Sequence, residues 1–143
     1  MRIIYEVDTS TKKVAVVIPT PEWLLEHTME ELVVKVVPTG ANYEIVEDAV
    51  VPSDRTFREA WRMGVRMGIT VNIPAAKIIT KERLREERKP LLEAQDILFQ
   101  RALETSASTT AIVAEKERLR DITDQVDALS ALADLKAISC EVS

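Results

Sequence analysis

The pattern of apolar residues changes near residue 73, and this change sets the organisation of the chain. Before it, short runs rich in β-branched residues alternate with turns, which is typical of strands. After it, apolar residues recur at helical spacing almost to the end. We therefore expect an α+β protein with two parts. A small β-rich α+β domain with short helices occupies residues 1–68, and a helical, coiled-coil-like region occupies residues 69–143.

Four segments before the change read as strands. Residues 2–7 and 14–18 flank a polar loop and predict a β-hairpin, whose second strand is apolar enough to be covered on both faces. Residues 43–46 predict a third strand, and we leave open whether it continues to Val51. Residues 69–73, after a turn bracketed by two glycines, form a last short strand or lead into the following helix.

Helix-start signals interrupt these strands. Pro21 suits a first helical turn. The pair Thr28 and Glu31 has the spacing of a capping box, in which each side chain bonds the other residue's backbone N–H. It predicts a helix from Met29, with the core-facing residues Leu32, Val33, Val36 and Val37. A second Thr-x-x-Glu pair predicts a short helix over residues 57–63, with Phe57 and Trp61 on one face and the pair Thr56 and Glu59 as its box.

A long helix is predicted over about residues 74–105. Leu84, Leu91 and Leu98 recur every seven residues, as in a coiled coil. Pro90 lies in the interior, where it removes a backbone hydrogen bond, so we expect a bent helix or two successive helices.

A second helix is predicted over about residues 110–123. Its apolar positions, continued beyond the helix, match a packing partner for the long helix, which predicts an antiparallel αα-hairpin; they are Ile112, Leu119, Ile122, Val126 and Leu129. A final short helix is predicted at about 131–138, capped by Ser130, with residues 139–143 as a tail.

No residue pattern specifies a reaction. The one histidine, His27, is expected to cap the turn that ends at residue 26, and the one cysteine, Cys140, lies in the predicted tail. One Cys and one His exclude an ordinary Cys/His zinc site. The three glycines form no phosphate-binding loop. We therefore expect no enzyme, and no catalytic, cofactor-binding or metal-binding residues.

The net charge and the pattern of charged residues restrict the kinds of partner that we expect. The net charge is −5, whereas nucleic-acid-binding domains usually carry a basic face. The basic stretch from residue 77 to residue 89 is interrupted by glutamates, so a solvated helix face with ion pairs such as Arg83–Glu87 is the simplest interpretation. No run approaches the roughly 18 uncharged residues of a membrane-spanning helix. We expect no nucleic acid and no membrane as partner.

Five segments together resemble a known group of proteins. They read VPSDRTFREAW at 51–61, KERLREERKPLL at 81–92, FQRALE at 99–104, KERLRDIT at 116–123 and LADLKAI at 132–138. The chain thereby resembles small proteins encoded in the tail and tail-fibre regions of tailed bacteriophages and prophages. Its C-terminal half is similar to the helical end of tail fibre assembly proteins, where a similar LRDI segment follows an arginine-rich helix.

The resemblance implies a structural component of a phage tail that connects fibre or adaptor proteins and forms a homo-oligomer. Such a protein is made in the host cytoplasm and resides in the virion. An assembly chaperone for the tail fibre, absent from the finished virion, is the alternative, and a small DNA-associated module is a third reading. The predicted partner contacts lie on the long helix: Arg83, Leu84, Arg85, Arg88, Lys89, Leu91 and Leu98.

Overall fold

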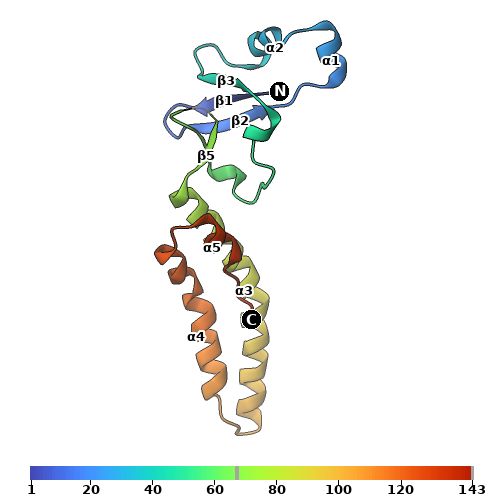
Figure 1. The fold of residues 1–143 in the computed structure, drawn as a ribbon. Helices are drawn as coiled ribbons and strands as arrows, with labels where there is room; N and C mark the ends of the chain where they lie inside the picture. Colours follow the sequence, from blue (N-terminus) through green and yellow to red (C-terminus); the bar gives the residue numbers. More distant parts are fainter. Residues whose placement is uncertain (67, 143) are drawn as a thin grey trace. The chain divides into compact units, whose positions relative to one another are not determined.

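The computed structural model describes residues 1–66 and 68–142 (Figure 1). The fold is α+β with a β-rich N-terminal part, as predicted. The chain divides into two compact units, Met1–Asn72 and Ile73–Ser143, here called the β unit and the helical unit. The division falls four residues after the expected boundary at 68/69, because residues 69–71 pair as a strand with the rest of the sheet.

The β unit is built on one antiparallel sheet. Its strand order is β3-β1-β2-β4-β5, and every neighbouring pair is antiparallel. The strands are β1 (Arg2–Asp8), β2 (Lys13–Val17), β3 (Tyr43–Val46), β4 (Trp61–Met63) and β5 (Ile69–Val71). The predicted hairpin is confirmed as β1 and β2, with Ile3 opposite Val17. Of the two readings of residues 69–73, the short strand is correct.

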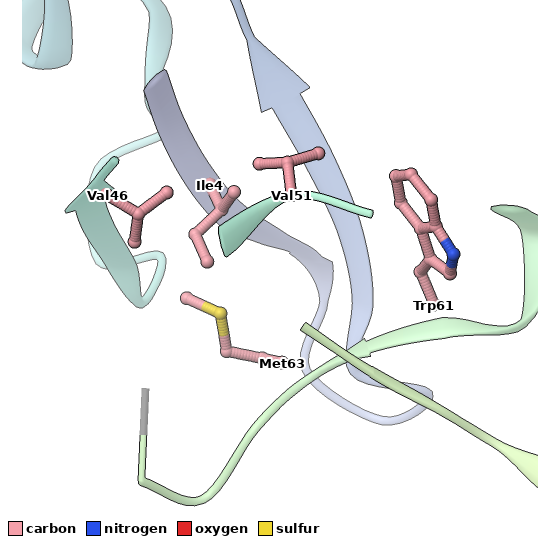
Figure 2. Close-up of a cluster of buried hydrophobic side chains, with 5 residues drawn as sticks. All are labelled: Ile4, Val46, Val51, Trp61 and Met63. Carbon is pink, nitrogen blue, oxygen red and sulfur yellow. The ribbon is translucent and has the colours of Figure 1, made fainter. Parts of the chain in front are cut away.

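Two adjacent isoleucines of β1 place apolar clusters on opposite faces of the sheet. Successive side chains of a strand point to opposite faces, and Ile3 and Ile4 are both fully buried. Ile4 packs in a cluster with Val46, Val51, Trp61 and Met63 (Figure 2). Ile3 packs in a second cluster against the α2 residues Leu32 and Val33. Val16 and Val17 of β2 join one cluster each, so both faces of β2 are partly covered, as predicted.

Local signals place the first two helices, α1 (Pro21–Glu26) and α2 (Met29–Val36). The capping box of α2 is confirmed, because Thr28 N–H donates to Glu31 at 2.9 Å and Glu31 N–H donates to Thr28 at 3.3 Å. The chain turns away after α2 at Gly40, whose positive φ of +84° suits glycine.

The second predicted capping box is wrong. The Thr56 hydroxyl donates to Asp54 Oδ1 at 2.6 Å and its N–H donates to the same oxygen, so this segment forms a turn within the loop. A short 3₁₀ helix, η2 (Arg58–Ala60), then leads directly into β4, where Trp61 pairs with Val71. Phe57 and Trp61 are both buried, but they do not share a helix.

A 3₁₀ turn also limits the third strand. Residues after β3 form η1 (Asp48–Val50), so the extension of this strand to Val51 is wrong. Asp48 lies 3.1 Å from the amino group of Met1 and 3.3 Å from Arg2, and these contacts fix the turn beside the start of β1.

The helical unit is an αα-hairpin with a short helix packed on it. Its elements are α3 (Ile73–Glu104), α4 (Thr110–Gln125), η3 (Val126–Ala128) and α5 (Leu132–Ala137). Figure 1 shows α3 as one helix, so the alternative of two successive helices at Pro90 is wrong. Buried side chains from all these elements form its core: Leu84, Leu119, Ile122, Val126 and Leu135. No described helix is both long and apolar enough to span a membrane.

Candidate protein-binding surfaces

The C-terminal segment, residues 138–141, is bound along the helical unit, so the predicted tail at residues 139–143 is wrong for residues 139–141. Residue 143 of that prediction lies outside the described residues. The Arg83 guanidinium donates to the carbonyl oxygens of Leu135, at 3.1 Å, and Ile138, at 2.8 Å. Arg118 donates to the carbonyl of Cys140 at 2.9 Å. All three bonds reach backbone carbonyls, so the two arginines hold this part of the chain independently of its side-chain types. Ser130 is not the cap of α5 either, since Ala131 precedes the first turn and no side chain caps it.

Glu87 completes this attachment. Its carboxylate accepts the Cys140 N–H at 3.1 Å and pairs with Arg83 at 2.7 Å, which confirms the predicted Arg83–Glu87 pair. Partial burial by itself raises the pKa of Glu87, but the hydrogen bonds from Cys140, Arg83 and Ser139 outweigh it. The pKa therefore lies below its usual value, and the carboxylate stays charged.

The two candidate nucleophile–base residues each have a structural role. His27 is the C-cap of α1, as predicted: its N–H donates to the Trp23 carbonyl at 3.0 Å, and its ring stacks on the Trp23 ring. Cys140 is 1% exposed, and its Sγ lies 3.4 Å from the Leu84 carbonyl. Burial, and then the nearby Glu87 carboxylate, raise the pKa of this thiol, which disfavours the reactive thiolate.

The structure separates the predicted contact residues into buried and open ones. Leu84 is fully buried and its carbonyl lies 3.4 Å from Cys140 Sγ of the C-terminal segment, so its prediction as a partner contact is wrong. The Arg83 guanidinium is engaged within the chain, where it donates to the carbonyls of Leu135 and Ile138. Arg88 donates to the Arg120 carbonyl of α4 at 2.8 Å, which leaves Arg85 and Lys89 as the exposed cations of this stretch.

The exposed cations lie among carboxylates. A shallow hollow of about 340 Å³ is lined by Arg85, Arg88, Lys89, Leu92, Glu93 and Asp96. Three cations are followed along α3 by two carboxylates, and this mixture of signs favours a protein partner with mixed charges over a polyanion such as DNA.

Apolar exposure in the helical unit increases toward the α3–α4 connection. In the leucine series Leu84 is buried, Leu91 is half-buried and Leu98 is 45% exposed. Near it, Ile97 and Leu103 are more than half exposed. The C-terminal segment covers the first part of the series and leaves this distal part of the hairpin open.

The β unit carries a separate set of exposed apolar side chains that the sequence reasoning missed. Leu25 of α1 is 85% exposed and Val34 of α2 is 86% exposed, while Trp23 packs inward on the Ile3 cluster. The capping box already indicated that Val34 is exposed, because it fixes where the helix starts. Once Met29 begins the helix, the 100° step per residue places Val34 away from the core-facing Leu32 and Val36.

Within residues 1–66 and 68–142, no three His, Cys, Asp or Glu side chains come together as metal ligands. Comparisons with protein-family models, with curated protein sequences and with solved structures give no match to this chain.

Proposed function

We propose that this protein is a structural component of a bacteriophage tail that connects fibre or adaptor proteins through protein–protein contacts. The observation that carries the proposal is that each of the two compact units has its own exposed apolar side chains. A connector needs two binding surfaces, and large exposed apolar side chains are common at protein interfaces. The resemblance to proteins encoded in phage tail regions is the reason for proposing a phage tail as the assembly.

The β unit supplies one of the proposed surfaces. Leu25 and Val34 lie on short helices whose inner faces are fixed by Trp23, Leu32 and Val33 against the sheet. A rigid scaffold under exposed apolar groups lowers the entropy cost of binding. We propose that this surface docks on one neighbouring tail protein.

The helical unit supplies the other surface. The distal part of the hairpin exposes Ile97, Leu98 and Leu103, while the other end of the hairpin is closed by α5. A helical hairpin with an open apolar face is suited to pack against further helices, those of another copy of this chain or of a fibre stem.

An assembly chaperone for the tail fibre remains the second candidate. The C-terminal segment favours this candidate, because it is held over an apolar core by polar bonds. A segment of the fibre protein could replace it by making the same backbone hydrogen bonds. The two candidates differ in one property: a chaperone leaves the finished particle, whereas a tail component stays.

Mass spectrometry of density-purified particles of the encoding phage tests the proposal. A fixed copy number per particle supports a tail component. Absence from particles, with abundance in the lysate and co-purification with the fibre protein, supports the chaperone. Absence from both particles and fibre complexes overturns both candidates.

A double variant ties the function to the surfaces. Leu25→Ser with Val34→Ser is expected to reduce incorporation into particles without changing the circular dichroism spectrum, since both side chains are exposed. Val7→Ser is the matched control, because Val7 is 61% exposed on β1. Equal incorporation of both proteins would exclude this surface.

A further inference from the structure

We propose that two copies of this chain pair through α3 in antiparallel orientation, with Ala94 of each copy at the two-fold axis. The surface involved is one open face of α3, here called the Ala94 face. Its uncharged members are Pro90, Leu91, Ala94, Ile97 and Leu98.

These residues share one side of the helix. Positions three, four and seven residues from Ala94 fall on its face, because an α-helix turns 100° per residue. Pro90 and Ala94 are exposed, Leu91 is half-buried, and Ile97 and Leu98 are 53% and 45% exposed. The contacts to α4 lie elsewhere on α3: Arg88 bonds the Arg120 carbonyl and Asp96 pairs with Lys116. The Ala94 face is therefore open.

The sequence of this face is symmetric about Ala94. Pro90 and Leu98 lie four residues on either side, and Leu91 and Ile97 lie three residues on either side. An isologous contact brings each residue opposite its mirror position, so this pattern places apolar side chains opposite apolar side chains. The small Ala94 at the centre lets the two helices approach closely.

Charges at the two ends select the antiparallel direction. Glu87 lies seven residues before Ala94 and Arg101 lies seven residues after it. Antiparallel pairing brings Glu87 of each copy opposite Arg101 of the other, whereas parallel pairing brings like charges together. The Glu87 side chain is 32% exposed despite its bonds to Arg83 and Cys140, and Glu141 adds a second carboxylate at this end.

A hollow on the Ala94 face lies where the apolar side chains of the second copy would pack. A hollow of about 420 Å³ is lined by Glu87, Pro90 and Leu91 of α3 and by Ser139, Cys140 and Glu141 of the C-terminal segment. In the symmetric arrangement Ile97 and Leu98 of the second copy lie opposite Leu91 and Pro90. The open apolar side chains of one copy therefore meet the hollow of the other.

The contact is small, so the dimer is expected to be weak. Residues 87–101 span about 22 Å of helix at 1.5 Å per residue. Such a length gives an interface in the lower size range, where association is transient. This inference concerns the isolated chain and holds whether or not the chain belongs to a phage tail.

Sedimentation equilibrium of the full chain from 1 to 500 µM tests the pairing. A reversible monomer–dimer equilibrium is expected, weakened at least tenfold by Ala94→Glu, which places two carboxylates at the axis, and also weakened by Arg101→Glu. Gln100→Glu adds the same charge off this face and is expected to leave association unchanged. A chain that stays monomeric at 500 µM, or an Ala94→Glu variant that pairs as well as the original, overturns the proposal.

Disulfide trapping tests the orientation separately. Ala94→Cys is expected to form a covalent dimer under mild oxidation, because the axis brings the two Cβ atoms together. Cys140 is buried and gives little background. A Leu91→Cys chain is expected to stay unlinked, since antiparallel pairing places the two positions six residues apart. Efficient Leu91→Cys linkage with none at Ala94→Cys would indicate another arrangement and overturn the proposal.

Discussion

Arg83 and Ile138 are joined by a 2.8 Å hydrogen bond from the guanidinium to the carbonyl, across 55 residues of sequence. The same guanidinium reaches the Leu135 carbonyl, at the other end of one helical turn. These two bonds, both donated by Nη2, fix the end of α5 on α3, where Leu135 is fully buried. Arg83 thus fixes α5 on α3, a role that the exposed Arg85 two residues later does not share.

Arg83→Lys is expected to destabilise the helical unit by about 2 kcal/mol, because a single ammonium cannot keep both the Nη1 bond to Glu87 and the Nη2 bonds to the Leu135 and Ile138 carbonyls. The exposed Arg85→Lys serves as control, with an expected change below about 0.5 kcal/mol. Urea unfolding followed by circular dichroism measures both. Equal stabilities for the two variants would contradict this role of Arg83.

The leucine series offers a matched pair of core and surface substitutions. Leu84→Ala is expected to cost about 2–5 kcal/mol, since it opens a cavity in the core of the helical unit, whereas Leu98→Ala at 45% exposure should cost far less. Thermal unfolding at low protein concentration, where the chain is monomeric, gives the comparison. If both substitutions cost the same, the distal hairpin is packed more tightly than described.

The two Thr-x-x-Glu segments are expected to respond differently to the same change. Thr28→Ala removes the cap of α2 and should cost about 0.5–2 kcal/mol. Thr56→Ala removes only the hydroxyl bond to Asp54 in a loop and should cost less. Denaturant unfolding of the two variants decides this. A larger loss for Thr56→Ala would show that its turn supports the sheet.

Acid is expected to weaken the attachment of the C-terminal segment. The folded-state pKa of Glu87 lies below the ordinary value of 4.5, so its contribution is present above that pH and is lost as pH falls through the lowered folded pKa. Unfolding midpoints measured from pH 7 to pH 3 should therefore fall most steeply below about pH 4.5. Glu87→Gln should flatten this fall, and an unchanged slope would assign it to other carboxylates.

A thiol reagent reports the same attachment directly. Cys140 is expected to react slowly in the native chain, because it is 1% exposed and its pKa is raised by burial. Arg118→Ala removes the bond to the Cys140 carbonyl and should speed the reaction several-fold at pH 8. An unchanged rate would mean that Arg118 does not hold the segment.

Features that depend on near neighbours were predictable. The capping box at Thr28, the proline-led α1, the β1–β2 hairpin and the long helices all follow from spacings of a few residues, where backbone sterics and local hydrogen bonds decide. The identical Thr-x-x-Glu pattern at Thr56 gave a wrong prediction of a helix cap, because the Thr56 hydroxyl donates instead to Asp54, two residues earlier.

The candidate surfaces were predictable only in part. Heptad spacing identified Leu84 and Leu98 as members of one series, but it could not say that the fold buries the first and leaves the second exposed. Likewise, Arg83 and Arg85 are alike in sequence, and only one of them lies against the carbonyls of α5.

The sequence by itself determined the two-part organisation, the types of the main elements and their caps, because these depend on residue type and short spacings. Tertiary structure alone decided that residues 69–71 complete the sheet, that residues 138–141 are bound and not a tail, and which leucines remain open. Those outcomes depend on contacts between residues more than 50 positions apart or on pairing with another strand, and no local pattern encodes them.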